Sequence, residues 1–203
     1  MHYTSFKGEK MKLTKKYLLA VLLLSLINCD LLSKNKILTS HLLNTLDNNK
    51  KEALVTFKNL LQDKSHLEYL KSEQAKMLTN FTEDDGIEQP HLQEKLKGTL
   101  SSEYNENQLN QLFSELGYEK TKQFLDNLHK MLQAIKDGTL RAFHDSSSFK
   151  DYNTTLEAKK AEALSSVKKE LYVQYYFYIN DLQTADDFFV LTRNHLMIFK
   201  NNL

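Results

Sequence analysis

The sequence predicts an all-α fold, a single compact bundle of about six to eight helices that follows a signal peptide and a short tether. Three observations predict it. The 203 residues include only five glycines and one proline, too few for a turn-dense β architecture. Apolar residues recur at intervals of three and four over the chain after residue 36, which is the period of an amphipathic helix. Several of these stretches follow a serine, threonine or asparagine, as helices with N-caps do. We expect no β-strand.

Residues 1–28 are predicted to be a signal peptide. A basic segment at 12–16 precedes the 11-residue apolar run Tyr17–Ile27. Crossing a bilayer takes a helix of about 20 residues, so this run fits the hydrophobic part of a secretory signal. A signal peptide with this basic segment and apolar run starts more naturally at Met11 than at Met1. The first ten residues are therefore an upstream extension or a longer basic region.

The only cysteine, Cys29, follows this run in the segment Leu26-Ile-Asn-Cys29. A bacterial lipobox has a leucine-like residue three positions before its cysteine and a small residue directly before it. Asn28 is larger than the usual alanine or glycine, although spirochaetal lipoboxes are loose at this position. We predict that Cys29 is the lipid attachment site and anchors the chain in the outer membrane. Several acyl chains together give stable anchoring. The alternative is a buried thiol at the end of an apolar helix.

The charge is unevenly distributed. Residues 1–28 hold five lysines and one glutamate, so the rest of the chain carries a net charge of −3 within a total of +1. An acidic body argues against a nucleic-acid partner, because that affinity comes largely from neutralising phosphates. We expect residues 29–36 to form a lipidated, polar tether and residues 37–203 to form the helical domain.

The first half of this domain contains three apolar stripes. A weak stripe lies at 37–46, and a stronger one at 53–61 ends near Asp63. Ser65-His-Leu-Glu68 has the spacing of a capping box and predicts the start of the next helix. Thr82–Pro90 holds the only proline beside a glycine and is predicted to be a loop. Its acids lack the spacing of a calcium-binding EF-hand.

Four signals define the middle of the domain. A short helix is expected over 92–100, and Asn105-Glu-Asn-Gln108 resembles the cap of the next one. Gly117 is predicted to end that helix in the left-handed conformation. A strong stripe at 124–135 is closed by Gly138. A short helix and a serine-rich loop are expected after it.

Two helices are predicted at the end of the chain. Thr154-Thr-Leu-Glu157 has capping-box spacing and starts the longest expected helix, from Thr155 to about Asp181. This helix becomes apolar nearly all round, as helices at the centre of a bundle do. Thr184-Ala-Asp-Asp187 caps the last helix. The aromatic cluster at 172–178 is interpreted as core, with a ligand pocket as the alternative.

No residue pattern predicts catalysis, a cofactor or a metal. The histidines of the domain are His41, His66, His91, His129, His144 and His195. No two of them stand four residues apart, so each is interpreted as a surface or interhelical polar residue. Ser165-Ser-Val-Lys168 matches a pattern of some acyl-transferring enzymes but lacks its companion motifs. The glycine-rich loops that approach phosphates are missing from the sequence.

Three segments resemble a known family. Asn105-Glu-Asn-Gln-Leu-Asn-Gln-Leu-Phe113, Leu125-Asp-Asn-Leu-His-Lys-Met-Leu-Gln-Ala-Ile135 and Tyr176-Phe-Tyr-Ile-Asn-Asp-Leu182 are similar to Borrelia outer-surface lipoproteins, a paralogous group of plasmid-encoded antigens. The resemblance is best over residues 92–199. It implies an α-helical fold, display on the cell surface and interaction with a host or tick protein. Some relatives bind complement regulators such as factor H. The family supplies no catalytic residues.

Two functions remain as hypotheses. The first is a surface lipoprotein that binds a host or tick-vector protein, in adhesion, immune evasion or vector colonisation. The second is a helical carrier of a small apolar ligand that faces the periplasm, which the tyrosines at 172–178 suggest. The oligomeric state and the identity of the partner stay open.

We expect the Cys29→Ala variant to lose incorporation of labelled palmitate and to keep its signal peptide, because no thiol is left to lipidate and cleavage follows lipidation. Metabolic labelling and gel mobility measure both effects. A Ser33→Ala variant in the tether is the control and should label normally. Full labelling of the Cys29→Ala variant would contradict the prediction.

Overall fold

A computed structural model of the chain describes residues 44–83, 90–140 and 155–200. The described helices lie in one compact unit that begins at Thr45. Within the described residues there are six α-helices, one short 3-10 helix and no strand. The predicted all-α fold is therefore confirmed.

Several predictions concern residues outside the described ranges. They include the signal peptide at 1–28, Cys29, the tether that it begins and most of the stripe at 37–46. Only Leu46 of that stripe can be placed, and it is buried. The short helix expected after Gly138 also lies mostly outside. The predicted domain boundaries stay predictions.

Helix α2, Asn48–Gln62, begins at an aspartate cap. The Asp47 carboxylate accepts a hydrogen bond from the Lys50 backbone N–H at 2.9 Å, which satisfies one of the amides left without a partner at a helix start. The helix ends at Asp63, where the sequence predicted its end. Its apolar stripe is buried and consists of Ala53, Leu54, Phe57, Leu60 and Leu61.

Asp63 also starts the next segment. Its carboxylate accepts a hydrogen bond from the Ser65 backbone N–H at 2.9 Å. It thereby caps the 3-10 helix Lys64–His66, which leads into α3, Leu67–Glu83. The prediction that Ser65 is the cap is wrong, because Ser65 lies inside the 3-10 turn. Hydrogen bonds from the backbone and side chain of Ser65 lower the pKa of Asp63.

Helix α4, Pro90–Lys97, starts on the only proline of the chain. Proline suits the first helical position because the N–H that it lacks would have no partner there. Since α3 ends at Glu83, the predicted break falls between two helices, and residues 84–89 lie outside the described ranges. Leu96 anchors α4 in the core.

Helix α5, Glu106–Asp137, is kinked at Gly117. Gly117 has φ 73° and ψ 176°, a combination that is essentially restricted to glycine. The predicted helix end at Gly117 is confirmed, because its φ and ψ are not helical and two helical stretches of different direction meet there. Its φ is positive as expected, but its ψ lies outside the left-handed helical region that the sequence analysis predicted. The buried Thr121 hydroxyl donates a hydrogen bond to the Phe113 carbonyl at 3.3 Å. This bond joins the two halves of α5.

Both ends of α5 agree with the sequence analysis. The Asn105 side chain accepts a hydrogen bond from the Asn107 N–H at 2.9 Å and caps the helix. Gly138 closes it with φ 69° and ψ 25°, in the left-handed region. The N–H of Thr139 then donates to the Ala134 carbonyl at 3.0 Å, as in a glycine-based C-cap.

Helix α6, Leu156–Ile179, begins one residue later than its predicted start at Thr155. Thr155 caps it, and its side chain accepts a hydrogen bond from the Ala158 N–H at 3.3 Å. With 24 residues it is the longest uninterrupted helix among the described residues, as predicted, because the 32 residues of α5 are divided at Gly117. Every residue from 171 to 178 is buried, which confirms the central position predicted for this segment.

Helix α7, Ala185–Lys200, starts with the predicted capping box. The Asp187 N–H donates to the Thr184 hydroxyl oxygen at 3.1 Å, and the Thr184 N–H donates to the Asp187 carboxylate at 2.9 Å. These reciprocal bonds satisfy amides that the helix cannot pair itself. The bonds from Thr184 hold the pKa of Asp187 below its usual range.

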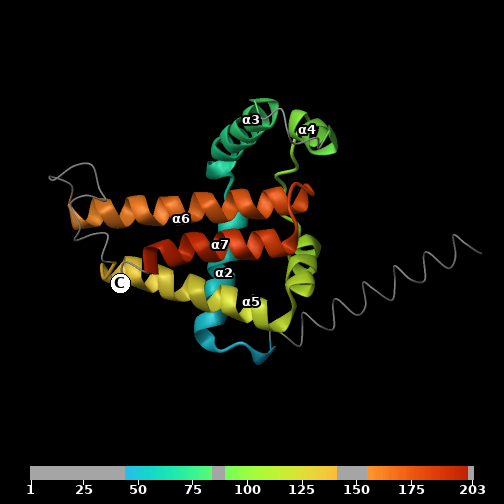
Figure 1. Ribbon diagram of the computed structural model, residues 1–203. Helices are drawn as coiled ribbons and strands as arrows, with labels where there is room; N and C mark the ends of the chain where they lie inside the picture. The colour runs from blue at the N-terminus through green and yellow to red at the C-terminus, as the bar shows by residue number, and fades with distance from the viewer. Residues whose placement is uncertain (1–43, 84–89, 141–154, 201–203) are drawn as a thin grey trace, which may run out of the picture. The chain divides into compact units, whose positions relative to one another are not determined.

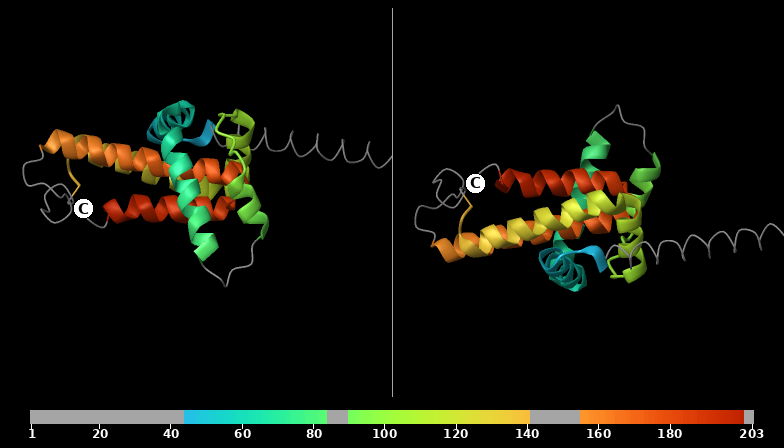
Figure 2. Two further views of the ribbon diagram at one scale, coloured as in Figure 1. Left: turned by 90° about the horizontal axis from the view of Figure 1, so that it is seen from above. Right: turned by 90° about the horizontal axis from the view of Figure 1, so that it is seen from below.

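The helices pack around one aromatic centre. In Figures 1 and 2, the part of α5 after Gly117 runs side by side with α6 and α7, and α2 crosses them. Helix α3 packs on α6 and α4 packs on α3. Phe57 of α2 is completely buried, with its ring centroid 5.2 Å from that of Phe124, 6.1 Å from Tyr175 and 6.2 Å from Phe188. These rings come from α5, α6 and α7, so four helices meet at Phe57.

We expect Gly117→Ala to lower the free energy of unfolding by about 1–3 kcal/mol, the usual cost of a backbone conformation that only glycine adopts easily. A methyl group at Gly117 would meet no heavy atom within 4 Å, so the loss comes from the backbone alone. Gly98→Ala is the comparison, because the φ of Gly98 is not in the left-handed region, and its expected smaller loss comes from a methyl group 3.2 Å from the Lys95 carbonyl oxygen. Equal losses for both variants in urea denaturation would contradict the prediction.

Candidate binding grooves

The sequence-based candidates for chemistry do not form a reaction centre in the described part of the chain. No three histidine, cysteine or acidic side chains there are placed to hold a metal ion. Ser165 and Lys168 both lie on α6 and are half-buried. His41 and His144 lie outside the described residues, as does the predicted lipid site Cys29. No described helix is long and apolar enough to span a bilayer.

His66 is the candidate histidine with the most closely defined surroundings. Its ring lies edge-on to the Tyr172 ring at 5.6 Å, and its Nε2 is 3.9 Å from an Asp63 carboxylate oxygen. Burial lowers the pKa of His66, and Lys168 and Lys169 act in the same direction, while Asp63 opposes them. The imidazole is therefore mainly neutral at pH 7 and serves as an interhelical contact, as the sequence analysis interpreted it.

The tyrosine cluster at 172–178 is part of the core. Tyr172, Tyr175 and Tyr176 have no exposed surface. The Tyr176 ring centroid is 4.5 Å from that of Tyr172 and 5.2 Å from that of Tyr175. The Tyr176 hydroxyl donates a hydrogen bond to the Leu61 carbonyl at 2.8 Å. Because the rings contact one another, the cluster no longer favours the carrier hypothesis that it suggested.

The first groove lies between α5 and α7, beside the start of α2, and has a volume of about 460 Å³. Its floor is mainly apolar and comprises Met131, Ala134, Leu140, Leu196 and Met197. Its polar rim includes Asn49, Asp126, His129, Lys130, Gln133 and Asp137. The rim carries charges of both signs around an apolar centre.

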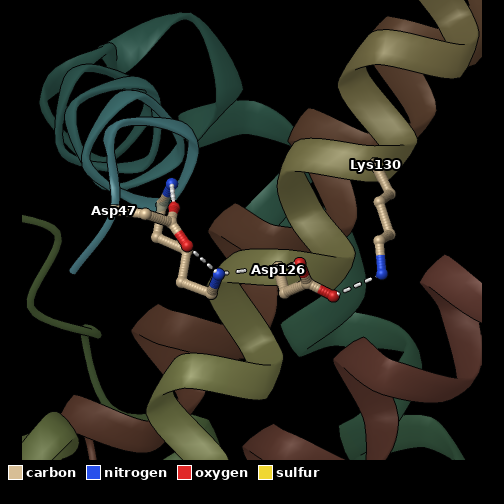
Figure 3. Close-up of polar contacts among 4 residues, drawn as sticks. Asp47, Asp126 and Lys130 are labelled. Carbon is tan, nitrogen blue, oxygen red and sulfur yellow. Dashed lines mark hydrogen bonds and ion pairs between the residues drawn. The ribbon is translucent and has the colours of Figure 1, made fainter.

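A charged network joins α2 to α5 (Figure 3), and two of its residues, Asp126 and Lys130, line the first groove. The Lys50 ammonium on α2 bonds to Asp47 and lies 3.8 Å from Asp126 on α5. Lys130, one turn further along α5, also bonds to Asp126, at 2.6 Å. The hydrogen bond to Asp47 raises the pKa of Lys50 and lowers that of Asp47. Lys50 is only 8% exposed, so the network ties α2 to α5.

Two apolar residues of α7 are exposed. Leu191 is 43% exposed and Met197 is 36% exposed. The helix instead buries the face that includes Phe188, Thr192 and Leu196, because its two neighbours α5 and α6 cover only that side. Met197 lines the first groove, whereas Leu191 does not.

The second groove, of about 520 Å³, is formed by α4, the first half of α5, the end of α6 and the turn into α7. It is more polar than the first. Its charged lining residues are Glu115, Asp181 and Asp187, and its amide side chains are Gln108, Gln111 and Gln183. Leu92, Tyr178, Ile179, Leu182 and Thr184 complete the lining.

The turn between α6 and α7 shapes one wall of the second groove. Asp181 has φ 53°, a left-handed conformation that aspartate tolerates better than most residues. Its carboxylate is 3.1 Å from the Lys95 ammonium of α4. The ion pair thus links the turn to α4 at the edge of the groove.

The chain matches no protein-family model and no curated protein. Any role for the two grooves must therefore be argued from their geometry alone. Sequence reasoning found neither of them, because each is lined by residues that lie far apart in the chain and share no local pattern.

The buried tyrosines give a matched test of the core. Tyr176→Phe should lower the free energy of unfolding by about 1 kcal/mol, the usual net contribution of a hydrogen bond, because the Leu61 carbonyl loses its donor. Tyr175→Phe should cost nothing, since the buried Tyr175 hydroxyl has no hydrogen-bond partner among the described residues. Urea denaturation measures both values. A larger loss for Tyr175→Phe than for Tyr176→Phe would contradict the assignment.

Proposed function

We propose that this chain is a lipoprotein of the outer membrane, displayed on the cell surface, that binds a host or tick-vector protein and performs no catalysis. The observation that carries the proposal is the order of a basic segment, a short apolar run and Cys29 at the start of the sequence. That order is typical of exported, lipid-anchored proteins. The resemblance to Borrelia surface lipoproteins agrees with it, and a complement regulator is one candidate partner.

The first groove supports the binding part of the proposal. Protein interfaces commonly have an apolar centre, an enrichment in methionine and a polar rim. The groove has an apolar floor with two methionines, Met131 and Met197, inside a rim of both charges. We assign it to an apolar side-chain group on the surface of the partner protein, because the charged rim would face the partner's polar residues.

The experiment uses intact cells that display the chain. The cells are incubated with serum and with tick-gut extract, and the retained proteins are quantified by mass spectrometry. Met197→Glu should weaken retention of the partner by about thirtyfold or more, since a hot-spot residue contributes about 2 kcal/mol or more to binding. Leu191→Glu is the control, because it places the same charge on an exposed site of α7 outside the groove.

Protease treatment of the same cells separates display from binding. A displayed chain is digested on intact cells, and retention of the partner disappears with it. Protection of the chain until the cells are lysed would contradict surface display and favour the periplasmic carrier. Digestion without any saturable ligand in either extract would contradict partner binding. Equal retention by both variants would remove the first groove as the contact surface.

A further inference from the structure

Helix α3 is attached to the bundle mainly through α6 and the 3-10 helix before it. The chain enters α3 from α2 through the 3-10 helix Lys64–His66, and its main neighbours are that 3-10 helix, α4 and α6. The Gln74 amide of α3 donates hydrogen bonds to the carbonyl oxygens of Leu96 and Gly98, at 2.6 and 2.8 Å. Helices α3 and α4 are thus bonded to each other at one edge of the bundle, beyond α6 (Figure 1).

His66 and Tyr69 make two of the contacts with α6. The His66 ring lies edge-on to the fully buried Tyr172 ring of α6, with 5.6 Å between the ring centroids, and the His66 side chain is only 11% exposed. Three residues further on, the Lys169 ammonium of α6 lies 5.4 Å from the centre of the Tyr69 ring. Both contacts hold the start of α3 against the same part of α6.

A charge on His66 would be poorly compensated. Its Nε2 atom is buried and has no hydrogen-bond partner within the described residues. One Asp63 carboxylate oxygen lies 3.9 Å from that atom, which is too far for a hydrogen bond. The other oxygen accepts the hydrogen bond of the Ser65 N–H. Because the Asp63 side chain is 48% exposed, water weakens its attraction for a charged imidazole.

The surroundings of His66 favour its neutral form. Burial lowers the pKa of His66, Asp63 raises it, and Lys168 and Lys169 of α6 lower it further. Tyr172, whose pKa is raised by burial, stays neutral. When α3 leaves α6, the histidine returns to its ordinary pKa of about 6.5. The neutral imidazole therefore contributes its full stability to docking above about pH 6.5, and this contribution is lost as the pH falls below that value.

We propose that His66 makes the docking of α3 on α6 sensitive to acid: protonation of its imidazole adds a buried positive charge where α6 already carries Lys168 and Lys169, and α3 then detaches. The other helices stay packed, because the aromatic rings around Phe57 gain no charge between pH 7.5 and pH 5.5. The inference goes beyond the proposed function, since it concerns the fold itself and needs no partner.

The test measures amide hydrogen exchange of the full chain in detergent micelles by mass spectrometry at pH 7.5 and pH 5.5. The rates are corrected for the intrinsic effect of pH. Protection of the α3 amides should fall by about fivefold to tenfold at pH 5.5, because a histidine with its ordinary pKa is then about ten parts protonated to one part neutral. Protection of α5 should not change. Equal losses in α3 and α5 would indicate general unfolding and would overturn the inference.

Two pairs of variants test the role of His66. His66→Gln keeps a polar side chain that does not titrate, so α3 should be equally protected at both pH values. His91→Gln is the matched control and should keep the full acid response, because it removes a histidine from an exposed site of α4, the helix packed on α3. Lys168→Gln should reduce the response, since one repelling charge is lost. Lys51→Gln removes the same charge from an exposed site of α2 and should not reduce it.

The variants also separate His66 from a second histidine. Burial lowers the pKa of His195 on α7, and Glu170 of α6 opposes that shift. His66→Gln leaves His195 in place, so an acid response of α3 that persists in this variant would overturn the inference. The lysine pair decides the question if His66→Gln does not fold, and equal responses of those two variants would then overturn it. Neither result affects retention of a partner on intact cells.

Discussion

The burial of Phe57 is the constraint on which the rest of the structure depends. Its ring contacts aromatic rings from α5, α6 and α7, and aromatic pairs of this kind add to the stability that burial alone provides. Once α2 is fixed across the other three helices, Lys50 on the same helix reaches Asp126 of α5. The walls of the first groove follow from that arrangement, because they belong to α2, α5 and α7.

The sequence predicted most of the fold because helix boundaries are largely local. Asn105, Gly138 and the box from Thr184 to Asp187 act through bonds to residues a few positions away. The errors occurred where neighbouring residues compete for one role. Thr155 replaces Thr154 as a cap, and Asp63 replaces Ser65. The choice in each case depends on where the packed helix begins, which a local pattern does not specify.

The two grooves were not predictable in the same way. Glu115 and Asp187 lie on different helices, and only the packing of α5 against α6 and α7 brings them to one groove. The aromatic cluster at 172–178 gave a strong signal in the sequence, but it forms the core. The residues that line the grooves share no pattern along the chain, because only the packing of the helices brings them together.

The kink at Gly117 restricts how the chain can change in length. One residue in an α-helix corresponds to a rotation of about 100°. An insertion or deletion next to this joint would turn Phe124 and Leu125, now buried after the kink, away from the core. A loop between helices can change in length without rotating the helices that it connects, whereas the single residue at the kink cannot. Length variation among descendants of this sequence should therefore accumulate in its loops and spare α5.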